Sequence, residues 1–180
     1  NVTILDGEGQ GTILNDDMAS INISPTALTL NEPSSSASFS VHLSSQPTDT
    51  VTLTISTSDP TECTVSPSAV LDASNWQSGI LVTVNAVDDA IKDGNQPCIV
   101  QLTAASTDPV YDGVVAADVT ATVQDDDGSG VIIIQLSLDV SEPNTTDSTT
   151  VRLTSEPTST VTIALVASDP TECTVPTEVI

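Results

Sequence analysis

Four short acidic stretches hold the side chains of this sequence that are best suited to binding chemistry. The chain carries 25 Asp and Glu residues against Lys92 and Arg152, which gives a formal net charge of −23. Carboxylate oxygens gathered from several loops are the ligands that a hard cation such as calcium prefers, with about six to eight ligands in flexible geometry. Whether these stretches can share an ion depends on the elements that position them.

Seven segments of the chain are predicted to be β-strands, because apolar residues alternate within them and Pro, Asp, Gly and Ser separate them. Their ranges are 20–31, 36–44, 49–57, 62–66, 79–87, 97–105 and 116–124. Side chains of a strand point alternately to its two faces, so every second residue is assigned to the core. These core residues are Phe39, Val41, Leu43, Val51, Leu53, Ile55, Val82, Val84, Cys98, Val100, Leu102, Val119, Ala121 and Val123. Short strands in this number predict an all-β sandwich.

The order of the strands predicts that the acidic stretches meet. If consecutive strands alternate up and down, the first, third, fifth and seventh finish at the same end of the sandwich. The acids that follow these four strands are, in turn, Glu32; Asp59 and Glu62; Asp88, Asp89 and Asp93; and Asp125, Asp126 and Asp127. Like charges this close repel by about 1 kcal/mol per pair even at near-bulk dielectric, so a counter-ion is expected. The alternative is a solvated acidic surface.

The sequence repeats itself with an offset of 110 residues. "SDPTECTV" at Ser58–Val65 returns at Ser168–Val175, and "LNEP" and "VSEP" share the offset. An offset kept through matching and diverging stretches indicates tandem duplication of a domain-sized unit. We therefore expect 1–17 to be the C-terminal strand of one repeat, 18–127 a complete repeat, and 128–180 the N-terminal part of a third, in a slice of a longer polypeptide.

Composition excludes several classes of function. A strongly negative chain repels nucleic acid and anionic membrane surfaces, and it lacks the cations that phosphate contacts need. No apolar run approaches the length of a membrane span, so membrane insertion is not expected. Residues suited to catalysis are scarce. His42 lies at an outward-facing position of a predicted strand. Trp76 is the only tryptophan, whereas a sugar-binding site usually offers several aromatic side chains for stacking. We expect a protein that is not an enzyme, with Trp76 packed on the sandwich edge.

The cysteines allow a disulfide. Cys63 and Cys98 begin the fourth and sixth expected strands, which both start at the acidic end, so a bridge between them is geometrically reasonable. At the same offset, Cys173 corresponds to Cys63, and its partner would lie 110 residues after Cys98, beyond the printed sequence. A bridge implies an oxidising compartment, and two buried free thiols are the alternative. Three glycosylation sequons begin at Asn1, Asn22 and Asn144, the last in a polar loop.

Together these residues resemble the Calx-beta repeat of sodium/calcium exchangers, integrin subunits and large extracellular adhesion proteins. The resemblance lies in a Glu after the first strand ("LNEP"), "DDAIKDG" after the fifth and a terminal "DDD". It implies a seven-stranded, antiparallel, immunoglobulin-like sandwich that binds calcium at its distal loops. The implied ligands are Glu32, Asp88, Asp89, Asp93, Asp125, Asp126 and Asp127, with Asp59, Asp16, Asp17 and Glu142 as weaker candidates.

Two departures from the family pattern predict fewer or weaker ions. Asn95 and Gln96 stand where relatives often carry further acids, and Pro33 replaces the usual Gly. The stretch "SNWQSGILVTVNAVDD" is more similar to the repeats of long surface adhesins than to the exchanger sensor.

The expected function is that of a structural, calcium-binding repeat in an extracellular adhesin, stalk or surface filament. Its expected partners are neighbouring repeats of the same chain and other copies in a filament, and it is expected outside the cell or at its surface. A calcium-sensing regulatory module and a non-catalytic part of a secreted hydrolase are the alternatives.

Overall fold

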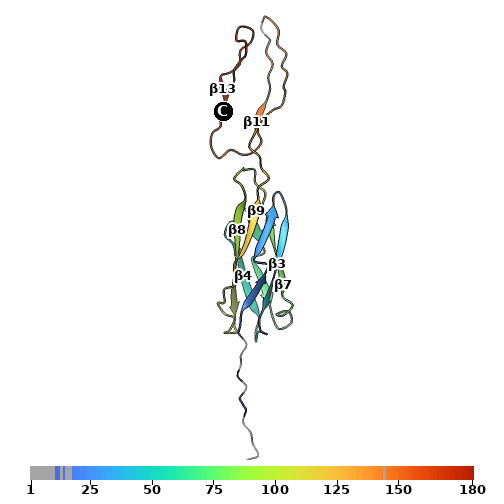
Figure 1. The fold of residues 1–180 in the computed structure, drawn as a ribbon, viewed down its shortest axis with the longest axis vertical. Coiled ribbons are helices and arrows are strands. Elements are labelled where there is room, and N and C mark those ends of the chain that lie inside the picture. The colour runs from blue at the N-terminus through green and yellow to red at the C-terminus, as the bar shows by residue number, and fades with distance from the viewer. Residues whose placement is uncertain (1–10, 13, 15–17, 144) are drawn as a thin grey trace, which may run out of the picture.

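The computed structural model describes residues 11–12, 14, 18–143 and 145–180. Residues 18–127 form an immunoglobulin-like sandwich of two β-sheets, and the described residues contain no helix. Figure 1 shows the strands running along the long axis of the molecule, with 128–180 continuing beyond the end where the last strand of the sandwich finishes. No helix capable of crossing a membrane occurs in the described part of the chain.

The two sheets contain four and five strands. The first has the order β1-β3-β7-β5, with β1 at Ile21–Ser24, β3 at Ser36–Leu43, β7 at Ile80–Ala86 and β5 at Cys63–Val65. The second has the order β2-β9-β8-β4-β6, with β2 at Ala27–Asn31, β9 at Val119–Gln124, β8 at Gln96–Ser106, β4 at Val51–Thr57 and β6 at Ser68–Leu71.

The core lies between the sheets and follows the alternation of the sequence. Every residue assigned to the core from the sequence is buried, and Leu30, Leu71 and Tyr111 join them with no exposed surface. Each fully buried Val, Leu or Phe side chain stabilises the fold by about 1.5–3 kcal/mol relative to an exposed one. Trp76 is partly buried and packs against this core, as expected.

The expected count of seven antiparallel strands is wrong in two respects. Nine strands, β1 to β9, lie within 18–127, and β2 pairs with β9 in parallel. The first expected strand, 20–31, is divided between the sheets at Pro25: β1 pairs with β3, and β2 pairs with β9. The fourth, 62–66, is shorter than expected and is followed beyond Pro67 by β6, which pairs with β4. Proline has no N–H to donate to a ladder, so a strand loses its partner at these positions and changes sheet.

These divisions leave the direction of the chain unchanged. β1 and β7 are both antiparallel to β3, so they run the same way, and β2 is parallel to β9. Because the acids that follow β2, β7 and β9 meet at one end, both halves of the first expected strand share one direction. β4 and β9 are both antiparallel to β8, so β4 runs in the direction of β9 and β7. β5 is antiparallel to β7 and β6 is antiparallel to β4, so this second pair also shares one direction. The alternation of up and down strands therefore holds, and with it the expectation that four acidic stretches meet.

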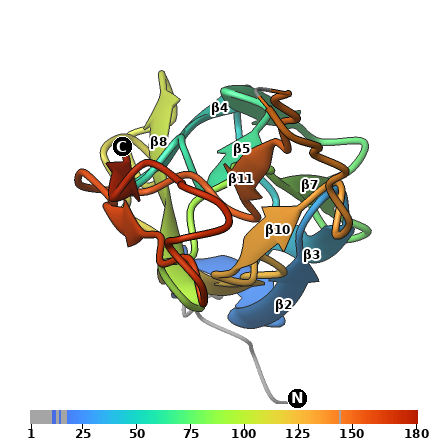
Figure 2. The same cartoon turned by 90° about the horizontal axis from the view of Figure 1, so that it is seen from above.

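Residues 128–180 form two small antiparallel pairs rather than a closed sandwich. β10 (Val131–Ile133) pairs with β11 (Val151–Leu153), and β12 (Ile163–Ala164) pairs with β13 (Glu178–Val179). Figure 2 looks down on this end, where β10 and β11 lie above the sandwich.

The pairing in 128–180 reproduces that of the sandwich at the offset of 110 residues. Val131 faces Leu153 as Ile21 faces Leu43, and Ile163 faces Val179 as Leu53 faces Ala69. The repeated sequence is thus accompanied by a repeated register of local pairing.

The end of the sandwich opposite the acidic stretches is held by two buried polar side chains. The hydroxyl of Tyr111, which has no exposed surface, donates to the carbonyl of Ser45 at 2.7 Å and accepts from its N–H at 3.1 Å. Asp108, 3% exposed, accepts a hydrogen bond from the N–H of Thr48 at 2.7 Å. Both ends of the turn 45–48 are therefore fixed to the loop that carries Asp108 and Tyr111.

The substitution Tyr111→Phe tests this fixation. It leaves the backbone groups of Ser45 without their partner, and we expect a loss of about 1–3 kcal/mol in the free energy of unfolding, measured by urea denaturation. Val110→Ala, at an exposed neighbour, is the control and should change stability little. Equal losses in the two variants would show that the hydroxyl contributes nothing specific.

Candidate metal centre

The acidic stretches meet where β2, β4, β7 and β9 end. Asn31 of β2 lies opposite Gln124 of β9, and Gln96 at the start of β8 lies opposite Val123. Cys63 at the start of β5 lies opposite Ala86 at the end of β7. We call the loops that follow these strand ends, residues 32, 59–62, 88–94 and 125–127, the acidic tip.

Carboxylates of the acidic tip form two groups that share one residue. Glu32, Asp88 and Asp126 are the more exposed group, and Glu32, Asp125 and Asp127 are the half-buried one. In each group the carboxylate oxygens lie within 4.8 Å of one another. Calcium–oxygen distances are about 2.3–2.6 Å, so oxygens about 4.8 Å apart are still able to bind one ion between them. Glu32 has two oxygens and is therefore able to serve both groups.

Asp125 fixes the relative position of two of the loops. Its carboxylate accepts hydrogen bonds from the N–H of Gly94 at 2.7 Å and from the N–H of Asp127 at 2.8 Å. These two bonds are the largest cause that lowers the pKa of Asp125. Gly94 has φ +81°, a left-handed conformation that glycine adopts without the strain of a side chain. The glycine of "DDAIKDG" thus presents its N–H to Asp125 and closes the 88–94 loop on the terminal acids.

Two other carboxylates of the acidic tip, those of Glu32 and Asp127, have raised pKa values. Burial, followed by the charges of Asp89, Glu62 and Asp125, raises the pKa of Glu32 to about 7. Burial and then the charges of Asp126 and Asp125 raise the pKa of Asp127, and its Oδ2 atom is buried without a hydrogen-bond partner among the described residues. A buried oxygen without a partner is costly, and a bound cation would supply that partner.

Glu62 belongs to the acidic tip although the predicted ligand set left it out. It is only 7% exposed, and burial, followed by the charges of Asp93 and Asp59, raises its pKa. By strand alternation, its position directly before the buried Cys63 predicts an outward side chain, so the sequence pattern did not indicate its burial. The strand order had already placed it at this end.

Asp59 has a local role that the sequence did not reveal. Its Oδ1 atom accepts hydrogen bonds from both the N–H and the hydroxyl of Thr61, and its carbonyl accepts from the N–H of Cys63. These bonds form the turn that leads Glu62 inward. The same two bonds join Asp169 and Thr171, which explains why the threonine recurs in both copies of "SDPTECTV".

The other predicted site residues are distributed as follows. Asp89 and Asp93 lie outside the two groups of three, yet their charges act on Glu32 and Glu62 respectively, after burial. Glu142 lies in the 128–180 segment and is exposed. Asp16, Asp17, Asn1 and Asn144 lie outside the described residues, while Asn22 is exposed on β1.

The predicted bridge between Cys63 and Cys98 is confirmed. It joins β5 of one sheet to β8 of the other at the end of the sandwich that carries the acidic tip, with 6.1 Å between the Cα atoms. Both residues are fully buried, whereas Cys173 is an exposed free thiol. The bridge connects the strands that flank the acidic loops.

Removing the disulfide should destabilise the fold. The bridge closes a loop with a sequence separation of 35 residues, which corresponds to about 4 kcal/mol in the chain-entropy model. We expect a loss of this order for the double variant Cys63→Ala and Cys98→Ala, measured by urea unfolding. The single variant Cys173→Ala is the control, and a double variant as stable as this control would contradict the expectation.

The raised pKa values predict an unusual pH dependence without calcium. Glu32 keeps its proton in the folded state up to pH about 7, whereas in the unfolded chain it releases it near 4.5, so the folded state binds more protons between these values. The free energy of unfolding in chelator should therefore fall as pH rises from about 5 to 8. Carboxylates with lowered pKa, such as Asp108, lose their contribution only under more acidic conditions, outside this window.

The substitution Glu32→Gln should make this pH dependence shallower and stabilise the calcium-free protein at pH 8. Asp118→Asn removes a carboxylate directly before β9, at the opposite end of that strand from the acidic tip, and should leave the slope unchanged. The measurement is urea unfolding at a series of pH values in chelator. A slope that Glu32→Gln does not alter would show that this carboxyl is solvated like an ordinary one.

No protein-family model matches the chain, and no curated protein matches it by sequence. Among solved structures it is similar to WR4, a C. elegans MSP family member, at 11% identity and TM-score 0.39, covering 58% of this chain and 95% of that one. A PapD-like domain of human CEP192 aligns at 9% identity and TM-score 0.46, covering 70% and 99%. The E. coli chaperone DraB aligns at 11% and 0.45, covering 62% and 58%. These likenesses are remote, and the fold assignment rests on the sheet topology of this chain.

Proposed function

We propose that this chain is a calcium-binding structural repeat of an extracellular adhesin, stalk or surface filament. The observation that carries the proposal is the acidic tip, where Glu32 is shared by two groups of carboxylates whose oxygens lie within 4.8 Å. Of the chain's two cationic residues, only Lys92 lies in these loops, so the local charge remains strongly negative. A bound divalent cation would relieve this repulsion.

The donor set favours calcium over other metals. Every candidate ligand is a carboxylate or backbone oxygen, and neither group of three contains His or Cys. Calcium accepts many oxygen ligands at variable geometry, which suits loops from four strand ends. Magnesium requires a small rigid octahedron and retains water ligands, so it should bind less well. With calcium bound, Glu32 and Asp127 would be held as carboxylates, and the Oδ2 atom of Asp127 would gain a partner.

A structural role is supported by the repetition of the unit. The register of β10 with β11 and of β12 with β13 follows that of the sandwich at the 110-residue offset. The chain leaves the sandwich directly from the acidic tip, through Asp125–Asp127 and Gly128–Gly130. An ion at the tip would therefore lie next to the joint between two repeats, where it would order the linker.

An extracellular location is supported by the Cys63–Cys98 bridge, because disulfides persist in oxidising compartments. The sequon at Asn22 is exposed on β1, an edge strand of its sheet, and is therefore accessible for glycosylation. Neighbouring repeats of the same chain would be the first partners, and other copies in a filament the second.

A thermal melt of the 180-residue protein in chelator, magnesium or calcium at fixed ionic strength tests the proposal. At a free calcium concentration 100 times the dissociation constant, binding to the folded state alone adds about 2.7 kcal/mol, enough to raise the midpoint by several degrees. The double variant Asp88→Asn and Asp126→Asn should lose this response. The double variant Asp112→Asn and Asp118→Asn removes the same charge away from the tip and should retain it.

Two outcomes would overturn the proposal. Equal responses to calcium and magnesium in all variants would indicate screening of a chain of net charge −23, and no response would make the acidic tip a solvated surface.

A calcium sensor, the alternative function, would additionally change its overall dimensions in small-angle X-ray scattering when calcium binds to the folded protein.

A further inference from the structure

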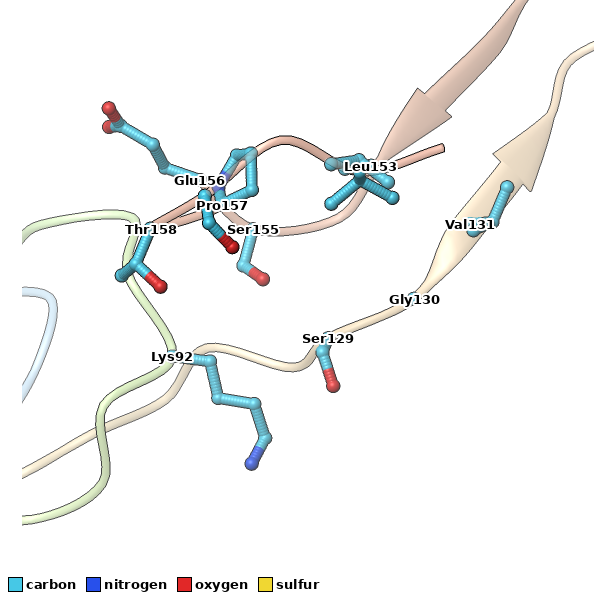
Figure 3. A pocket seen from close by; sticks show the side chains of 11 residues that line it. Lys92, Ser129, Gly130, Val131, Leu153, Ser155, Glu156, Pro157 and Thr158 are labelled. Carbon is cyan, nitrogen blue, oxygen red and sulfur yellow. The ribbon is translucent and has the colours of Figure 1, made fainter. Parts of the chain in front are cut away.

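The loop 88–94 of the sandwich contacts a turn of the following segment. The N–H of Glu156 donates a hydrogen bond to the carbonyl of Ala90 at 2.6 Å. Glu156 belongs to the turn 155–158, which follows β11, so residues 66 positions apart in sequence meet here. Figure 3 shows this turn on one side of a cavity, with Lys92 of the loop and Ser129 of the linker on the other. The cavity has a volume of about 540 Å³.

The linker between the two parts is tied to the same turn. Thr154 donates its N–H to the carbonyl of Gly130 at 3.0 Å, and its hydroxyl donates to the carbonyl of Gly128. A Cβ atom added at Gly130 would lie 3.1 Å from the Thr154 hydroxyl, so glycine permits this close approach. Loop, linker and turn thus form one connected junction.

The turn recurs within the sandwich itself. Residues 45–48 read "SQPT" and residues 155–158 read "SEPT", so only one position differs at the 110-residue offset. The residue before each turn makes equivalent bonds, because the N–H of Ser44 donates to the carbonyl of Ser20 as that of Thr154 donates to the carbonyl of Gly130. In the sandwich, Tyr111 and Asp108 hold both ends of the turn. A complete repeat therefore carries a preformed turn at one end and a loop that accepts such a turn at the other.

We propose that the loop 88–94 is a docking surface for the turn 155–158 of the next repeat, and that the turn 45–48 docks in the same way on the repeat before it. The proposal rests on the tandem arrangement in the proposed function but not on calcium. The contact uses backbone atoms of Ala90 and Glu156, so the change from Gln46 to Glu156 does not abolish it. Lys92 and Glu156 line the same cavity on opposite sides.

A cysteine cross-link in the full chain tests the contact. From the hydrogen bond and standard bond lengths, the Cα atoms of Ala90 and Glu156 lie no more than about 6.5 Å apart, within disulfide range. In a Cys173→Ser background, the pair Ala90→Cys and Glu156→Cys should oxidise to an intramolecular disulfide. The pair Ala90→Cys and Ser148→Cys is the control and should not, because Ser148 precedes β11, at the end of that strand away from the linker. Equal cross-linking of both pairs, or none of the first, would overturn the proposal.

A second measurement does not depend on new cysteines. The variant Glu156→Pro removes the donor N–H, whereas Glu156→Ala retains it. In ¹⁵N relaxation experiments, β10 and β11 should tumble together with the sandwich in the natural sequence and in Glu156→Ala, and more independently in Glu156→Pro. Independent tumbling in all three proteins, or common tumbling in all three, would contradict a role for this bond.

Both experiments are repeated in chelator and in calcium to separate the two proposals. A cross-link that forms in either condition, from a protein whose melt ignores calcium, would retain the docking surface and remove the calcium site. A calcium-dependent melt without the cross-link would retain the calcium site and remove the docking surface.

Discussion

The parallel pairing of β2 with β9 is the constraint on which the candidate site depends. It aligns the last residue of β2 with the last residue of β9, so that Glu32 and the Asp125–Asp127 stretch leave the same sheet side by side. The pairing exists because the first strand changes sheet at Pro25. Without that change, β2 would continue beside β3, and Glu32 would leave the other sheet.

The cost of this arrangement is electrostatic. Carboxylates from four loops are brought together with few compensating hydrogen bonds, and burial adds to their repulsion at Glu32, Glu62 and Asp127. Asp125 and Asp59 differ, because backbone or threonine donors occupy their oxygens and lower their pKa. The tip thus contains two kinds of acid: those that hold loops in place and those that remain available to an ion. The disulfide and the continuous core of the sandwich stabilise the folded state, and this offsets the repulsion between the crowded carboxylates.

The sequence predicted the core and the meeting of the acidic stretches because both depend on periodicity and strand direction alone. Phe39 and Val84 are buried because they alternate correctly, and the tip forms because divided strands keep their direction. What could not be predicted depends on contacts across the fold. Pro25 and Pro67 indicate interruptions, but only the three-dimensional arrangement shows that the chain crosses to the opposite sheet there. Glu62 follows Asp59 by three residues, and only the turn made by Thr61 distinguishes the inward carboxylate of Glu62 from the locally bonded one of Asp59.

The parallel pairing also determines how the sandwich would respond to mechanical force. The chain enters at one end and leaves at the other, so a pull between residues 18 and 127 draws β2 and β9 in opposite directions along their own axes. From Ala27 opposite Thr120 to Asn31 opposite Gln124, the hydrogen bonds between these strands lie across the direction of pull. These bonds would be loaded together rather than broken one after another, so β2 and β9 would separate only when all of them give way at once.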